Sequence, residues 1–164
     1  MIEILKDFEE MWLAEYLQDE SRWKSVFVNY HSPFVERLWT EWGPYRVNLH
    51  RIHPCTQEEA LFHPHPWPSA MKILSGEYEM AIGFSAGEIA PPVAATVVLV
   101  EGASYEMTHP DGWHFVRPIG APAMSLMVTG KPWERSSPGK GEKLSPLSAE
   151  QKQEIFSFFR ERYK

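Results

Sequence analysis

Apolar side chains recur at three- and four-residue spacing near both ends of the chain, which is the period of an amphipathic helix. At the N-terminus this stripe predicts a helix over residues 2–18. At the C-terminus, an S-x-x-Q capping box that begins at Ser148 precedes a second stripe and predicts a helix over 148–162. Residues 19–44 are rich in aromatic side chains without a clear period, and a short helix around 33–41 is the prediction there.

Between these regions the pattern changes to short apolar or alternating runs bounded by Gly, Pro, Asn and Asp, which is typical of β-strands. The predicted strands cover residues 45–53, 59–64, 70–75, 77–84, 94–100, 103–109, 112–117 and 122–129. No long helix separates them, which disfavours a parallel βαβ arrangement and favours an all-β sandwich or small barrel. We therefore expect one structural domain: a helical extension at 1–44, a β-barrel at 45–130, and a surface segment with the C-terminal helix at 131–164.

Composition narrows the functional classes. The chain has 164 residues, 43% of them hydrophobic, which is enough for one sizeable core. Its net charge of −6 disfavours a nucleic-acid partner, and no apolar run has the length of a membrane helix. The acidic start lacks the basic region of a signal peptide, so a cytoplasmic protein is expected. Because Cys55 is the single cysteine, a tightly bound metal would be held mainly by nitrogen.

The segment His63-Pro64-His65 carries the clearest chemical signal. In an extended chain, residues two apart point to the same side about 6.6 Å from one another, and a following proline favours that conformation. A turn at Pro110-Asp111-Gly112 then brings His114 to the start of a strand, with His109 as the alternative third histidine. Three neutral imidazoles suit a divalent metal such as Fe(II), Zn, Ni, Mn or Cu and leave coordination positions open.

These residues resemble the cupin superfamily, whose two motifs are G(x)5HxH(x)3–4E(x)6G and G(x)5PxG(x)2H(x)3N. The paired histidines and the closing glycine of the first motif match His63, His65 and Gly76. Gly102, Pro110, Gly112 and His114 match the second motif. Compared with that motif, this chain has two extra residues after Gly102 and one fewer before His114. Ser69 stands near the usual Glu and Pro118 at the terminal Asn, so the resemblance implies a metal site of three histidines without a carboxylate.

Within the cupins, such a site is similar to that of the thiol dioxygenases and the β-diketone-cleaving dioxygenases, where Fe(II) binds the substrate and O2. The hypothesis is a non-haem Fe(II) dioxygenase that acts on a small molecule. A non-catalytic cupin that binds or senses a metabolite, and a metal-dependent sugar isomerase or epimerase, remain alternatives because this fold hosts many functions. Cupin barrels commonly form dimers, so a homodimer is expected.

Further side chains are candidates for the pocket. Strand alternation places Val47, Arg51 and His53 on one face and His50 on the other. Because Val47 favours the interior, Arg51 or His53 is expected near the cavity mouth, where Arg51 could hold a substrate carboxylate. His109, if it is not a ligand, is a candidate general base or substrate contact. The aromatic and sulfur-containing side chains expected to line the pocket are Trp67, Tyr78, Tyr105 and Met107.

Overall fold

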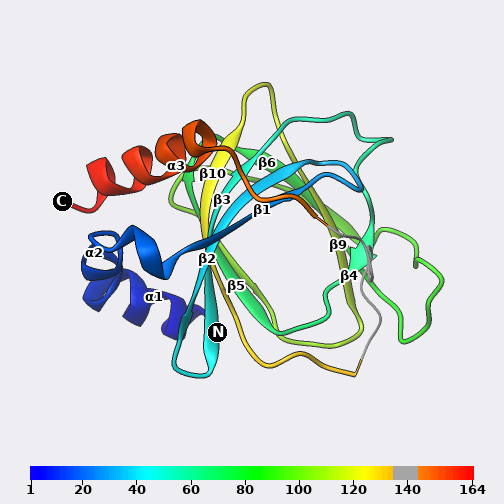
Figure 1. Cartoon of the computed structure of the whole chain (residues 1–164). Helices are drawn as coiled ribbons and strands as arrows, with labels where there is room; N and C mark the ends of the chain where they lie inside the picture. Colours follow the sequence, from blue (N-terminus) through cyan, green and yellow to red (C-terminus); the bar gives the residue numbers. More distant parts are fainter. Residues whose placement is uncertain (135–143) are drawn as a thin grey trace.

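A computed structural model describes residues 1–134 and 144–164, which contain ten β-strands and helices near both ends of the chain (Figure 1). The strands are β1 (Lys24–Val28), β2 (Val35–Trp42), β3 (Tyr45–Ile52), β4 (His63–Pro64), β5 (Ser69–Ser75), β6 (Tyr78–Phe84), β7 (Ala95–Leu99), β8 (Ser104–Met107), β9 (Gly112–Pro118) and β10 (Ala123–Thr129). The helices are α1 (Ile2–Met11), α2 (Leu13–Tyr16), the 3-10 helix η1 (Glu20–Arg22) and α3 (Ala149–Arg162). In these ranges no helix has the length and apolar character needed to cross a membrane.

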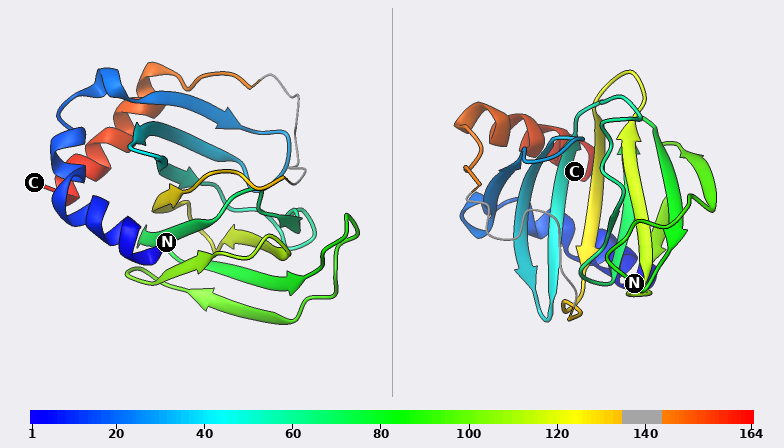
Figure 2. Two further views of the ribbon diagram at one scale, coloured as in Figure 1. Left: turned by 90° about the horizontal axis from the view of Figure 1, so that it is seen from below. Right: turned by 90° about the vertical axis from the view of Figure 1, so that its right-hand side faces the viewer.

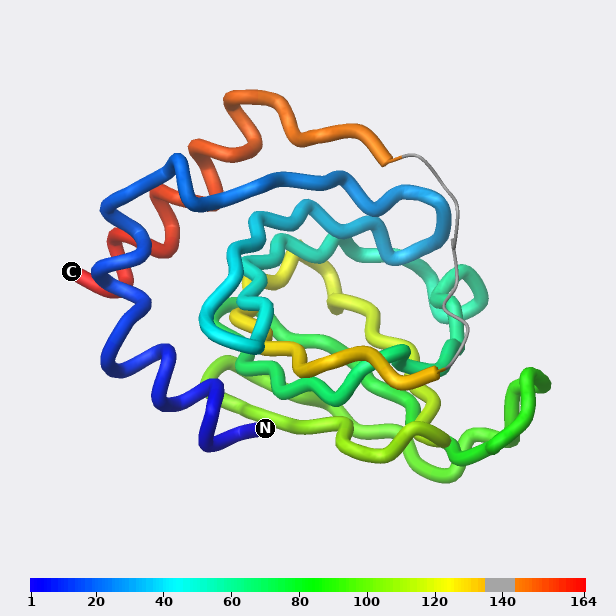
Figure 3. Tube along the Cα trace, turned by 60° about the horizontal axis from the view of Figure 1, so that its bottom comes forward, coloured from blue at the N-terminus to red at the C-terminus, as the bar shows by residue number. Residues whose placement is uncertain are grey.

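The strands form two antiparallel sheets that face each other (Figures 2 and 3). The six-stranded sheet has the order β1-β2-β3-β10-β5-β8, and the four-stranded sheet has the order β4-β9-β6-β7. Side chains from both sheets meet in one buried cluster between them, formed by Met71, Ile73, Tyr78, Ala123 and Met127. Because an apolar cluster joins the two inner faces, the sheets enclose a common interior.

The outer face of the six-stranded sheet is covered by α1 and α3, which lie together on the left of Figure 1. This second cluster buries apolar side chains of both helices and of the sheet, among them Leu5, Phe8, Leu38, Val47, Leu49, Leu126, Ile155 and Phe159. The predicted capping box is confirmed: the Ser148 side chain accepts from the Gln151 backbone N–H, and the Gln151 side chain accepts from that of Ser148. The middle strands of the large sheet, β3, β10 and β5, are therefore mostly buried on both faces.

The predicted helix around 33–41 is wrong, because residues 35–42 form β2. This strand pairs with β3 along its whole length and with β1 on its other side. Buried and more exposed positions alternate along it, which is the period of a strand. The sheet thus takes in residues that were expected in a helical extension.

The other predicted elements agree with the structure in type. The predicted strand at 59–64 is reduced to the two residues of β4, and the N-terminal helix is divided at Trp12 into α1 and α2. The remaining seven strands and the C-terminal helix are confirmed, with ends that shift by one or two residues. The predicted surface segment at 131–146 lies mostly outside the described residues.

Candidate metal centre

Three histidines converge in the space between the two sheets. Antiparallel pairing of β4 with β9 places His63 directly opposite His114, and His65 follows two residues after His63. The ring centroids are 4.5 Å apart for His65 and His114, 5.1 Å for His63 and His114, and 5.9 Å for His63 and His65. One nitrogen from each ring lies within 4.8 Å of those of the other two, so the three side chains could hold a single metal ion.

Local hydrogen bonds orient two of these rings. The Nδ1 atom of His63 donates to the backbone oxygen of Leu61 at 2.8 Å, which leaves the lone pair of Nε2 free. The Nδ1 atom of His65 lies 3.0 Å from Oγ of Ser69, and the tautomer in which Nδ1–H donates to this oxygen leaves the lone pair of Nε2 free. Nδ1 of His114 is buried and has no partner among the described residues. The three imidazoles offer nitrogen lone pairs that fit a divalent metal ion. Such an ion would provide partners for buried polar atoms that are otherwise costly to bury.

Burial keeps these imidazoles neutral. Loss of solvation lowers the pKa of His63 to about 4 and that of His65 to about 3. It also lowers the pKa of His114 well below its usual value, and the neighbouring histidines add to that effect. Neutral imidazole is the form that binds a metal, so at neutral pH no proton has to be displaced from the site.

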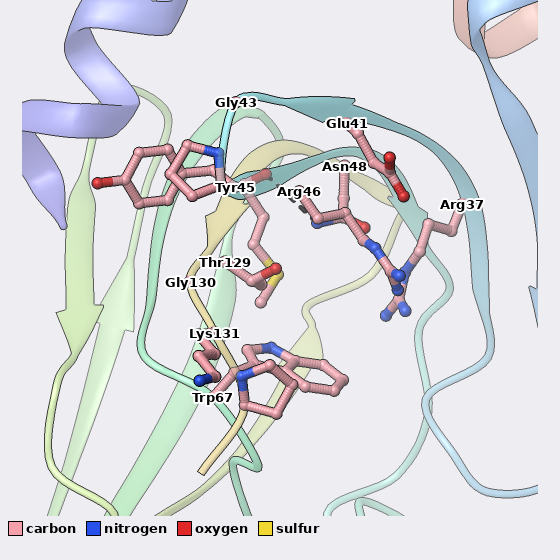
Figure 4. A pocket seen from close by; sticks show the side chains of 13 residues that line it. Arg37, Glu41, Gly43, Tyr45, Arg46, Asn48, Trp67, Thr129, Gly130 and Lys131 are labelled. Carbon is pink, nitrogen blue, oxygen red and sulfur yellow. Dashed lines mark hydrogen bonds between the residues drawn. The ribbon is translucent and has the colours of Figure 1, made fainter.

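The three histidines line a cavity of about 170 Å³, whose wall also includes Arg37 and His50. A second cavity of about 360 Å³ shares three wall residues with it: Arg37, Trp67 and Met127. Figure 4 shows this second cavity, with Arg37 and Arg46 reaching toward one another from β2 and β3. The two spaces therefore adjoin one another, with Arg37 and Trp67 in the wall of both.

The aromatic residues expected in the pocket lie at different distances from the three histidines. Trp67 lines both cavities, and the ring of Tyr105 lies 6.4 Å from that of His114, centroid to centroid. Tyr78 is fully buried beside them, and its hydroxyl donates to the sulfur of Met71 at 2.9 Å. Met107 lies elsewhere: with Tyr105 it lines a separate cavity of about 250 Å³.

His109 lies outside the three-histidine cluster. Its side chain is 61% exposed, its Nδ1 atom accepts from the backbone N–H of Asp111 at 3.2 Å, and it lines the separate cavity together with Met107. The structure therefore brings His114, not His109, to His63 and His65.

The expected orientation of β3 is corrected by the structure. Arg51 and His53 both contact the carboxylate of Glu36, and Arg51 also pairs with Glu154 of α3, on the side that the helices cover. The side chain of His50 points instead into the cavity of the three histidines. The reason is that α1 and α3 supply apolar partners for the opposite face, so burial of an apolar residue does not identify the inner face.

Two cavity residues, Arg37 and His50, were not among the predicted site residues. Arg37 was hidden because its segment was assigned to a helix, and His50 because the two faces of β3 were exchanged. Once residues 35–42 are known to form a strand, its alternation places Arg37 on the same side as Val35 and opposite Glu36.

No model of a known protein family matches the chain, and no curated protein shows a significant match to it. Solved structures are similar in fold. Hydroxypropylphosphonic acid epoxidase (HppE) from S. wedmorenis has a TM-score of 0.50 at 13% identity, covering 64% of this chain and 55% of that chain. Fe(II)-HppE with the alternative substrate (S)-1-HPP has a TM-score of 0.54 at 13% identity, covering 68% and 58%. KdgF from Halomonas sp. has a TM-score of 0.48 at 10% identity, covering 66% and 88%.

The chain thus spans little more than half the length of the epoxidase structures that it matches. At such low identity the likeness to the two epoxidase structures concerns the fold alone, and it supports a cupin-like fold for this chain. The cluster of three histidines within that fold is consistent with a divalent metal.

Proposed function

We propose that this protein is a metal-dependent enzyme of the cupin type that acts on a small molecule, with one divalent ion held by His63, His65 and His114. The observation that carries the proposal is the convergence of three neutral, largely buried imidazoles on one point beside a cavity. Such a cluster is expensive to bury unless its nitrogen atoms have partners, and a metal ion supplies them.

The more specific proposal is a non-haem Fe(II) dioxygenase of the three-histidine type, with the two sheets as its cupin barrel. Ser69 stands where a carboxylate ligand would be expected, so the ligand set carries no negative charge. An ion bound by neutral imidazoles keeps its positive charge and open coordination positions, and iron adds redox chemistry. Fe(II) is favoured because HppE, which shares the fold, was solved with Fe(II).

The chain's own residues would bind and orient the substrate. The interior cluster formed by Met71, Tyr78 and Met127 shields the back of the cavity from water. The shared wall residue Trp67 offers a flat apolar surface between the two cavities. These side chains would hold an apolar part of a small molecule near the three histidines, and exclusion of water strengthens polar contacts there.

Metal binding is the first test. Metal-free protein titrated anaerobically with Fe(II) should bind one ion per chain. His63→Ala and His114→Ala should each weaken binding by more than about 100-fold, since even loss of a residue that only supports a ligand costs 10–100-fold. His109→Ala is the matched control and should bind normally, because His109 lies outside the cluster. A chain that binds no ion, or variants that bind as well as the wild type, would refute the metal centre.

Oxygen consumption is the second test. Iron-loaded protein should consume O2 with at least one member of a panel of thiols, β-diketones and catechol-like compounds, and the His63→Ala variant should not. Metal binding without O2 consumption on any of these compounds would refute the dioxygenase while leaving the metal centre in place. Interconversion of aldoses without O2 would identify an isomerase or epimerase instead.

A further inference from the structure

Arg37 brings a positive charge to the wall of the cavity without a carboxylate to balance it. It lies opposite His50 in the pairing of β2 with β3, and its Nε–H donates to Nε2 of His50 at 2.9 Å. In residues 1–134 and 144–164, no carboxylate forms an ion pair with this guanidinium. Its two terminal nitrogens, which carry four N–H bonds, are therefore available to a ligand.

The surroundings do not favour this charge. Loss of solvation lowers the pKa of Arg37 to about 10; Tyr30 opposes this shift, and the nearby positive charge of Arg46 adds to it. Arg37 is still protonated at neutral pH, so the fold retains a cation in a poorly solvated place. Retaining an unbalanced charge costs free energy, and an anionic ligand would offset that cost.

Other donors in the same wall also lack acceptors. Because Nε2 of His50 accepts from Arg37, the proton of this neutral ring lies on Nδ1, which is buried without a partner. The indole Nε1–H of Trp67 is buried without a partner as well, and Trp67 lines both cavities. In the described part of the chain, the residues that line this space thus carry three kinds of N–H donor without an acceptor.

Positive charge continues into the second cavity (Figure 4). Arg46 and Lys131 both line it, and Glu41 is the carboxylate among its wall residues. The guanidinium of Arg46 stacks on the ring of Trp39, 4.2 Å from the centroid, rather than pairing with Glu41. An excess of positive charge at this site in a chain of net charge −6 favours the entry of an anion.

We infer that the cavity is built for a small organic anion whose oxyanion group, a carboxylate or a phosphoryl group, is bound by the terminal nitrogens of Arg37. Arg46, which lines the adjoining cavity with Arg37, adds positive charge that attracts the anion. The inference rests on the proposed function only in placing the reacting part of the molecule beside His63, His65 and His114. The anion subsite itself requires no metal.

The test uses metal-free protein, so that an anion cannot bind through a metal ion. Succinate and methylphosphonate are titrated separately by isothermal titration calorimetry at low salt and neutral pH. We expect one site per chain, and the tighter of the two probes identifies the head group as a carboxylate or a phosphoryl group. Arg37→Met should weaken binding by at least about tenfold, because a charge-assisted hydrogen bond lost is roughly a 10- to 150-fold loss in affinity.

Three further variants make the result specific. Arg37→Lys keeps the charge but not the planar fork, so an intermediate loss is expected. Arg46→Met alters an exposed residue of the entrance and should weaken binding less than Arg37→Met, and it serves as the alternative if Arg37→Met does not fold. Arg162 lies on α3 and forms an ion pair with Glu101 at the surface. Arg162→Met removes the same charge there and should leave the affinity for the anion unchanged.

Arg37→Met also separates the two proposals, because it should lose affinity for the anion in the metal-free protein and still bind one Fe(II) ion per chain, since Arg37 is not one of the three clustered histidines. If neither probe binds the wild type, or if Arg37→Met and Arg46→Met bind as tightly as Arg162→Met, the anion subsite is refuted whatever the metal titration shows.

Discussion

Mild acid should destabilise the metal-free protein, because four histidines are buried in neutral form. Desolvation lowers the pKa of His63 to about 4 and of His65 to about 3, and it lowers those of His50 and His114 well below their usual value. In the unfolded chain these groups take up protons as the pH falls below about 6.5. Above that pH the buried neutral histidines carry no proton-linked cost. The free energy of unfolding then decreases as the pH falls from about 6.5 toward the pKa values of the folded state.

The magnitude follows from proton linkage. Between pH 7 and pH 5.5, a histidine that stays neutral in the folded state loses roughly 1.3 kcal/mol relative to the unfolded chain, since one pKa unit corresponds to about 1.36 kcal/mol. Four such residues lose roughly 5 kcal/mol, which is as large as the whole stability of many domains, at about 5–15 kcal/mol. Aspartate and glutamate side chains titrate mainly below this range, so the window reports chiefly on histidines.

The assay is urea unfolding in the presence of a chelator, at constant ionic strength, followed by the fluorescence of the seven tryptophans. His65→Asn should reduce the loss between the two pH values by about a quarter, and the exposed His109→Asn should leave it unchanged. A free energy of unfolding that differs by less than about 1 kcal/mol between pH 7 and pH 5.5 would refute the assignment of buried neutral histidines.

Three further substitutions test neighbouring parts of the structure. Ser69→Ala removes the hydroxyl that contacts Nδ1 of His65 and should weaken metal binding about 10- to 100-fold in competition with a chelator; an unchanged affinity would show that Ser69 does not support the ligand. Gly83→Ala would place a Cβ atom 2.9 Å from the ring of Phe62 and from a proline carbonyl oxygen, and should cost about 1–3 kcal/mol in urea unfolding. Ser148→Ala removes the capping box of α3 and should cost about 1 kcal/mol, so an unchanged unfolding midpoint would contradict that role.

The proximity of His63 and His65 could be predicted from local features of the chain, whereas His114 is favoured over His109 as the third histidine by the order of the cupin motifs. Prolines hold His63 and His65 in an extended segment, where residues two apart share a side. The turn before His114 begins β9, which pairs directly with β4. That pairing is a long-range contact, which no local feature of either strand predicts.

β2 could not be recognised in the same way, because polar residues occupy both of its faces. Glu36 is buried, which the alternation of apolar and polar residues does not anticipate. Its carboxylate is satisfied by Arg51 from β3, by His53 just beyond that strand and by Gln151 from α3. The charge of Glu36 can be buried because these partners, which lie 15 to 115 residues away in sequence, satisfy it. The local pattern of residues around Glu36 does not predict them.

The same arrangement explains how the interior can be polar without loss of the core. Since α1 and α3 receive the apolar residues of β3, including Val47 and Leu49, the inward positions of the strand do not have to stabilise the fold by apolar burial. Those positions carry Asn48 and His50, and the neighbouring strand adds Arg37. For β2 and β3, apolar burial thus comes largely from the helix-covered face, whereas their opposite face carries polar side chains beside the cavities. Conservative changes at Arg37 should therefore affect anion binding more than stability, which is the reverse of what is expected for Leu49.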